Sequence, residues 1–156
     1  MTHTVIPFRP TPAVDPDMAR VATTIERHGL HLVHVGEGCS CEDCRADPLP
    51  PDQRFGYTIG LTDLGRPELL VRGLGARETA GVLNRWGDSV LAGQEFEAGH
   101  LLCEGPGGPT WELVAVRRPS RTLRWAARYY RTSGSGGLSA LELIPARRPC
   151  PCGACC

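Results

Sequence analysis

The chain has 156 residues, 41% of them apolar, and a formal net charge of zero at pH 7. This length suits one domain with a core of its own, and a neutral chain lacks the basic excess of a general nucleic-acid binder. No stretch approaches the ~20 apolar residues that span a bilayer, and the N-terminus lacks the apolar segment of a secretory signal. We therefore expect a cytoplasmic protein, in which thiols stay reduced.

The termini differ in composition from the middle of the chain. Four prolines lie within residues 1–16, which predicts a flexible N-terminal segment. A single α+β domain is expected over 17–145, followed by a cysteine-rich tail over 146–156. A helix is expected to begin near Asp15 or Asp17, with Pro16 in its first turn, and to stop at Gly29. Residues 30–36 alternate as a strand does, and a loop with three cysteines follows over 36–52.

Residues 54–74 form the most informative stretch. Two short runs, Phe55–Leu61 and Glu68–Leu74, flank a segment rich in turn formers and predict a β-hairpin. The first strand then has two faces: Tyr57, Ile59 and Leu61 on one, and Gly56, Thr58 and Gly60 on the other. A face of glycine and threonine predicts that another backbone or a ligand approaches closely there.

The second half of the chain predicts further strands and helices. The expected elements are a helix over 76–92, a strand over 96–103 interrupted at Gly99, a strand over 110–117, a helix over 120–131 and a strand over 138–144. These elements lack the alternation of strands and helices that produces parallel sheets. The sequence therefore predicts an α+β fold with a mainly antiparallel sheet and two or three packed helices.

The pattern around the hairpin resembles the DUF4262 family of bacterial proteins, a domain of unknown function. The matching positions are Phe55, Tyr57, Thr58, Gly60, Leu61, Pro67, Glu68, Leu69, Gly73, Leu83 and Asn84. Residues 141–143 resemble that family's final strand, so the resemblance extends over about 25–144. It implies an α+β domain and no particular activity. The cysteine clusters are not part of the family's core pattern and indicate a specialisation of this branch.

The spacing C-x-C-x-x-C occurs twice in the chain. Its cysteines are Cys39, Cys41 and Cys44 in the first copy, and Cys150, Cys152 and Cys155 in the second, with Cys156 adjacent. Each copy contains a C-x-x-C pair, whose two thiolates can reach one ion from a single turn. Two such pairs supply the four sulfurs of a tetrahedral zinc site, with Zn–S distances of about 2.3 Å. We therefore predict zinc binding by these cysteines, with the ion joining the tail to the loop.

Seven clustered thiols are more than one zinc ion needs, so several interpretations stay open. Cys39, Cys150 and Cys156 could be spare, bridge a second ion or take part in redox chemistry. Iron–sulfur clusters and copper(I) are less favoured occupants of the same thiolates. The alternative interpretation, without a metal, is that these cysteines form disulfides or are reactive thiols in two loops. His34 could complete a three-sulfur site, although a half-buried strand histidine is the commoner case.

A second candidate site is a polar pocket on the sheet. Its residues are Tyr57, Thr58, Glu68, Arg72 and His34. Glu68 and Arg72 share a strand face, and a structural ion pair beside a core tyrosine is favoured over a ligand site. A basic stretch over 117–131 places four arginines on one helical face, where a phosphate-bearing or acidic partner could dock. A solvated helix face is the commoner explanation of such a stretch.

These observations predict a small cytoplasmic accessory or binding module with a structural zinc ion. Its partner would be an unidentified protein or small molecule, with no membrane and no nucleic acid involved. One alternative is an enzyme: a zinc-dependent hydrolase with an open metal position, or a thiol redox enzyme that uses the clustered cysteines. Another is a carrier of copper(I) or zinc. The chain contains no phosphate-binding loop and no zinc-protease or serine-hydrolase motif that would name a reaction.

Overall fold

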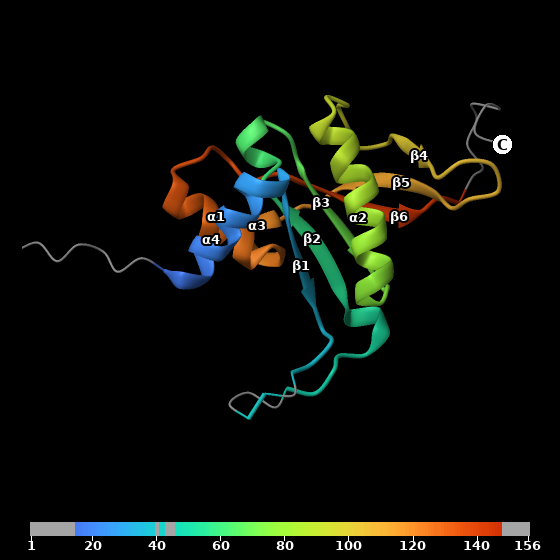
Figure 1. Cartoon of the computed structure of the whole chain (residues 1–156). Helices are drawn as coiled ribbons and strands as arrows, with labels where there is room; N and C mark the ends of the chain where they lie inside the picture. Colours follow the sequence, from blue (N-terminus) through green and yellow to red (C-terminus); the bar gives the residue numbers. More distant parts are fainter. Residues whose placement is uncertain (1–14, 40, 43–45, 148–156) are drawn as a thin grey trace, which may run out of the picture.

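A computed structural model describes residues 15–39, 41–42 and 46–147 and shows a six-stranded sheet with helices on both faces (Figure 1). The helices are α1 (Pro16–His28), α2 (Ala76–Leu91), α3 (Pro119–Thr122) and α4 (Arg124–Ser133), with 3-10 turns η1 (Pro51–Gln53) and η2 (Thr62–Leu64). The strands are β1 (His31–Val35), β2 (Phe55–Ile59), β3 (Glu68–Arg72), β4 (Leu101–Cys103), β5 (Thr110–Ala115) and β6 (Ala140–Pro145). Most of the expected flexible segment 1–16 and of the tail 146–156 lies outside the described residues.

The strand order is β1-β2-β3-β6-β5-β4. Four of the five pairings are antiparallel, and β3 pairs with β6 in parallel. A parallel pair needs a long crossover connection, and here the chain between β3 and β6 contains α2, β4, β5, α3 and α4. The expected α+β fold is confirmed, with a mixed sheet that is mostly antiparallel. The described residues contain four α-helices, of which α3 is a single turn, where two or three were expected.

Two apolar clusters pack on opposite faces of the sheet. Helix α2 covers one face, where Leu83 and Trp86 pack with Leu69 and Val71 of β3. Helices α1 and α4 cover the other face, where the second cluster contains Met18, Val21, Tyr57, Ile59, Leu70, Ala126 and Tyr130. Consecutive residues of β3 therefore point into different clusters, which explains why this strand is apolar along its length.

The start and stop signals of α1 are confirmed. The Asp15 carboxylate accepts from the backbone N–H groups of Asp17 and Met18, at 3.2 and 3.4 Å, and Pro16 occupies the first turn. Gly29 ends the helix in the left-handed conformation with φ of 83°. Asp15 also forms an ion pair with Arg128 of α4, which joins the two helices on this face of the sheet.

Three local expectations differ from the structure. Leu61 was expected beside Tyr57 and Ile59, but it lies in the α2-side cluster because β2 ends at Ile59 and Gly60 turns the chain with φ of 129°. The expected strand over 96–103 is reduced to three residues that follow a turn at 97–100, in which His100 N–H donates to the Glu97 carbonyl. The helix expected over 120–131 is broken at buried Leu123, whose backbone is not helical.

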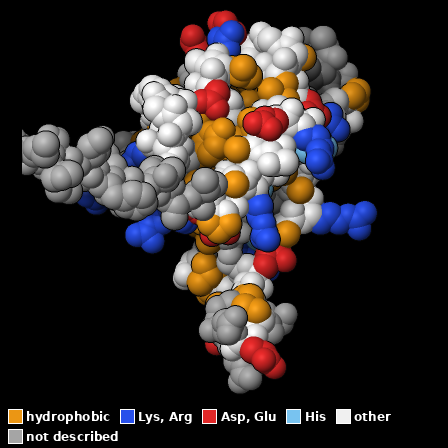
Figure 2. Space-filling view, turned by 60° about the vertical axis from the view of Figure 1, so that its left-hand side comes forward, with side chains coloured by type: hydrophobic (Ala, Val, Ile, Leu, Met, Phe, Trp, Pro, Cys, Tyr) orange, Lys and Arg blue, Asp and Glu red, His pale blue; other side chains and the backbone are white. Residues whose placement is uncertain are grey.

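The described residues of the connection from β1 to β2, which are 36–39, 41–42 and 46–49, project from the body and are called the arm below (Figures 1 and 2). Backbone bonds tie its two sides together: Leu49 N–H donates to the Gly36 carbonyl and Cys39 N–H to the Ala46 carbonyl, both at 2.8 Å. At its base, the Glu37 carboxylate accepts from Ala76 N–H at the start of α2, at 3.0 Å. The described part of the arm is therefore anchored to the domain at its base and closed on itself.

In the described part of the chain, none of the helices is both long and apolar enough to pass through a bilayer.

Candidate functional site

The carboxylate of Glu68 is buried at the start of β3, with 0% of the residue exposed. Its Oε2 accepts from the Thr58 hydroxyl at 2.6 Å. Its Oε1 accepts from Thr62 N–H at 2.9 Å and from Gly60 N–H at 3.2 Å. Its Oε1 also accepts a short hydrogen bond from the Tyr130 hydroxyl of α4. Four donors thus surround one buried carboxylate, as desolvation of such a group requires.

The donors around Glu68 are themselves hydrogen-bonded. The Thr58 hydroxyl accepts from Leu69 N–H at 2.9 Å, where the β2–β3 ladder ends. The Tyr130 hydroxyl accepts from Gly60 N–H at 2.6 Å. The network therefore joins β2, the η2 turn, β3 and α4, and it fixes the turn between the two central strands.

Burial raises the pKa values of both acids in this network, the Glu68 carboxyl and the Tyr130 hydroxyl. Desolvation raises the pKa of the Glu68 carboxyl, and the hydrogen bonds from Thr58, Tyr130 and Thr62 oppose that rise. Desolvation and the neighbouring Glu68 raise the pKa of the Tyr130 hydroxyl far above its ordinary value. Tyr130 therefore keeps its proton at any physiological pH and acts as a donor. Raised pKa values are typical of catalytic acids, but the complete burial of Glu68 makes it a structural anchor.

The face of β2 that carries glycine is closely approached, as the sequence predicts. A Cβ added at Gly56 would overlap the Cγ2 methyl of Thr79 in α2. A Cβ added at Gly60 would lie 2.8 Å from the Gly29 carbonyl oxygen. In both places the approaching group belongs to the protein itself, so the glycines serve packing.

The structure brings together only part of the predicted sheet pocket. Thr58 and Glu68 meet as described, and the Tyr57 hydroxyl instead accepts from Trp125 N–H at 3.2 Å. Arg72 does not pair with Glu68. It binds Glu142 of β6 at 3.1 Å, and its guanidinium lies 5.1 Å from the centre of the Phe55 ring. His34, opposite Gly56 on β1, is half-buried, and neither ring nitrogen has a hydrogen-bond partner among the described residues.

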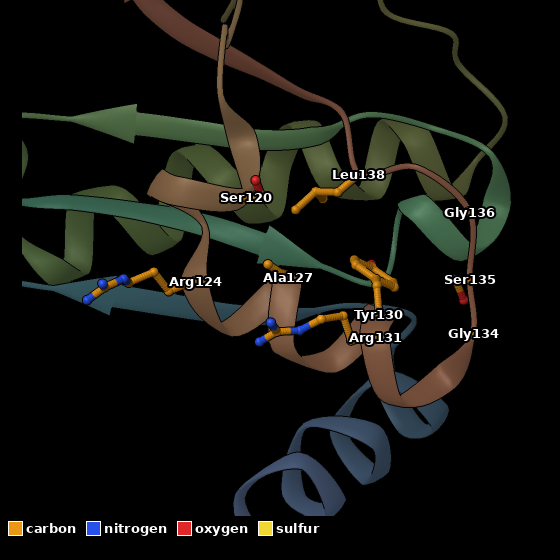
Figure 3. A pocket seen from close by; sticks show the side chains of 9 residues that line it. All are labelled: Ser120, Arg124, Ala127, Tyr130, Arg131, Gly134, Ser135, Gly136 and Leu138. Atoms are coloured by element: carbon orange, nitrogen blue, oxygen red, sulfur yellow. The ribbon is translucent and has the colours of Figure 1, made fainter.

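A cavity of about 670 Å³ lies on the outer side of Tyr130 (Figure 3). It is lined by Ser120, Arg124, Ala127, Tyr130, Arg131, Gly134, Ser135, Gly136 and Leu138. The tyrosine thus contributes its hydroxyl to the Glu68 network while its ring forms part of the cavity wall. Sequence reasoning missed this role of Tyr130, because the only signal was its helical spacing with Leu123, Ala126 and Ala127.

Two cysteines of the first segment, Cys39 and Cys41, lie on the arm. The Sγ atoms of Cys39 and Cys41 are 2.7 Å apart, and both residues are exposed. Within residues 15–39, 41–42 and 46–147 no group of three or more His, Cys, Asp or Glu side chains is placed to hold a metal ion. The other predicted ligands, Cys44, Cys150, Cys152, Cys155 and Cys156, lie outside the described residues. Cys103, the remaining cysteine, is half-buried in β4.

Comparison with known proteins identifies a family and no function. The sequence pattern of a family described as "Domain of unknown function (DUF4262)" matches residues 24–148. No curated protein and no solved structure matches the chain.

Proposed function

The chain belongs to the DUF4262 family, a domain of unknown function, and we propose that it is a small cytoplasmic binding module that holds zinc through its cysteine segments. The observation that carries this proposal is the position of Cys39 and Cys41, two cysteines of the first segment, which are both exposed on the described part of the arm. An exposed loop of this kind buries little apolar surface. A metal ion bound by thiolates stabilises such a segment directly.

The topology sets a requirement for a site that joins both cysteine segments. β1, which leads into the arm, and β6, which leads into the tail, run in the same direction because each is related to β3 through the observed pairings. Two strands lie between them in the sheet, and Figure 1 shows the arm at the bottom of the view and the end of β6 at its right. A joint site therefore requires the residues after β6 to reach back to the arm.

Elemental analysis of protein purified under reducing conditions tests this proposal. We expect about one zinc ion per chain in the parent. If one ion joins the segments, the paired variants Cys41→Ser with Cys44→Ser and Cys152→Ser with Cys155→Ser both lose it. Cys103→Ser is the matched control and keeps its zinc, because this cysteine lies in β4. A parent without zinc would overturn the proposal.

A second candidate is thiol–disulfide exchange, favoured by the 2.7 Å between Cys39 and Cys41 Sγ atoms. In that reaction two electrons and two protons pass from the two thiols to a disulfide of a partner, so that Cys39 and Cys41 become joined by a disulfide and the partner's disulfide becomes two thiols. A titration of accessible thiols before and after incubation with oxidised glutathione distinguishes the candidates. Zinc-bound thiolates react slowly until a chelator is added, whereas an exchanging pair reacts at once.

A further inference from the structure

The cavity beside α4 has the size of a small-molecule site. It opens between α3, α4 and the segment that leads to β6, and its volume of about 670 Å³ falls within the range of ~300–1,000 Å³ typical of ligand sites. Nothing in the Glu68 network or in the cysteine segments accounts for it.

Two arginines give the cavity its charge. Arg124 and Arg131 lie seven residues apart in α4, two turns along the same face, and Figure 3 shows both extending from the helix in the same direction. In the part of the chain that the structure describes, neither forms an ion pair, whereas Arg128, which lies between them in α4, pairs with Asp15. No acidic residue lines the cavity. The wall thus carries two positive charges that no described residue neutralises.

Two acids that contact residues of the cavity wall are already hydrogen-bonded. Asp63 accepts a hydrogen bond from the Ser135 hydroxyl at 2.5 Å, and Glu68 lies behind Tyr130 with its own four donors. Both carboxylates are therefore held by groups other than the two arginines. The guanidinium groups remain available to an anion from solution.

The rest of the wall is suited to an apolar body. The ring of Tyr130 and the side chains of Ala127 and Leu138 provide apolar surface, and Ser120 adds a hydroxyl with no protein partner among the described residues. A ligand with an anionic group at one end and an apolar group at the other would use both parts of the cavity.

We propose that this cavity binds a small organic phosphate monoester, with its phosphate held by Arg124 and Arg131 and its apolar part against Tyr130 and Leu138. A phosphate monoester carries about −1.5 to −2 charges at pH 7, which matches two unpaired guanidinium groups, whereas a carboxylate matches only one. This site is independent of the cysteine segments and of zinc.

NMR titration of the full chain with phenyl phosphate tests the site. We expect saturable shifts of amide signals within residues 120–138, with a dissociation constant on the order of 1 mM or below. Inorganic phosphate, which lacks the apolar part, and benzyl alcohol, which lacks the charge, are expected to bind at least about tenfold more weakly.

Charge-matched variants make the test specific. Arg124→Gln and Arg131→Gln each remove one wall charge from an exposed position, so the fold should persist, and each is expected to weaken phenyl phosphate binding about tenfold or more. Arg117→Gln and Arg121→Gln remove the same charge from residues outside the cavity and should leave binding within about twofold of the parent. Equal weakening in all four variants, or tighter binding of inorganic phosphate than of phenyl phosphate, would overturn the proposal.

Discussion

Replacing Thr58 by valine should test how much the Glu68 network stabilises the fold. Valine keeps the shape and the strand preference of threonine, so the substitution removes little more than one hydroxyl. That hydroxyl donates to Glu68 Oε2 at 2.6 Å and accepts from Leu69 N–H at 2.9 Å. The variant therefore leaves one carboxylate oxygen and one buried amide without these partners.

The expected magnitude follows from the two lost bonds. A hydrogen bond to a charged group contributes about 1.5–3 kcal/mol, and a buried amide without a partner costs about 1–3 kcal/mol. Together they predict a loss of about 3–5 kcal/mol from the free energy of unfolding. This is a large fraction of the ~5–15 kcal/mol typical of a whole domain.

Urea unfolding followed by tryptophan fluorescence measures this loss. With an m value of roughly 1–3 kcal/mol per M, the midpoint should fall by about 2 M at unchanged slope. Thr79→Val is the matched control, since Thr79 is equally buried but its hydroxyl makes only a 3.5 Å bond to the Leu74 carbonyl. The control should lie within about 1 kcal/mol of the parent. A Thr58→Val midpoint equal to that of the control would refute the reasoning.

Further predictions concern pH and backbone strain. Burial raises the folded-state pKa of Glu68 above its ordinary 4.5. The stability that this group contributes is therefore complete below pH 4.5 and is lost as pH rises through the raised value. Glu68→Gln should abolish this pH dependence when the free energy of unfolding is measured across pH. Burial lowers the folded-state pKa of His31 below 6.5, so the stability that this residue contributes is lost as pH falls below 6.5. His31→Gln should remove this dependence of the free energy of unfolding on pH, which is opposite in sign to that of Glu68. Gly60→Ala should lower the free energy of unfolding by about 1–3 kcal/mol or more, and with it the melting temperature, because φ of 129° strains alanine and its Cβ would meet the Gly29 carbonyl oxygen. Gly81→Ala, at an open position in α2, should instead stabilise by about 0.5–1 kcal/mol in the same calorimetric scan.

Local signals predicted most of the secondary structure. The Asp15–Pro16 start and the Gly29 stop of α1, the two strands of the central hairpin and the 16-residue α2 were all evident from the sequence. Each depends on interactions between residues close in the chain, such as a cap, a turn or an apolar stripe.

Long-range relations were not evident in the same way. Tyr130 reaches Glu68 across 62 positions, and no spacing rule connects a helix tyrosine with a strand carboxylate so far away. The parallel pairing of β3 with β6 and the position of Leu61 on the α2 side likewise depend on how distant elements pack. Glu68 itself did carry a signal, because an acidic residue at the head of an apolar run must find donors if it is buried.

The cavity beside α4 was likewise only partly evident from the sequence. Its arginines were recognised as one helical face, but the sequence does not show that α3 and the segment before β6 enclose a space next to them. It also does not show which arginine is already paired, and Arg128 is removed from the face by Asp15 of the distant α1.

Zinc-edge X-ray absorption of the reduced parent protein, purified without added metal, tests the proposed metal site most directly, because it reports the identity of the ligand atoms. Binding by the two C-x-x-C pairs predicts a first shell of four sulfurs at about 2.3 Å. A shell dominated by nitrogen or oxygen, or a sample without zinc, would contradict a thiolate site and direct attention to thiol–disulfide exchange at Cys39 and Cys41.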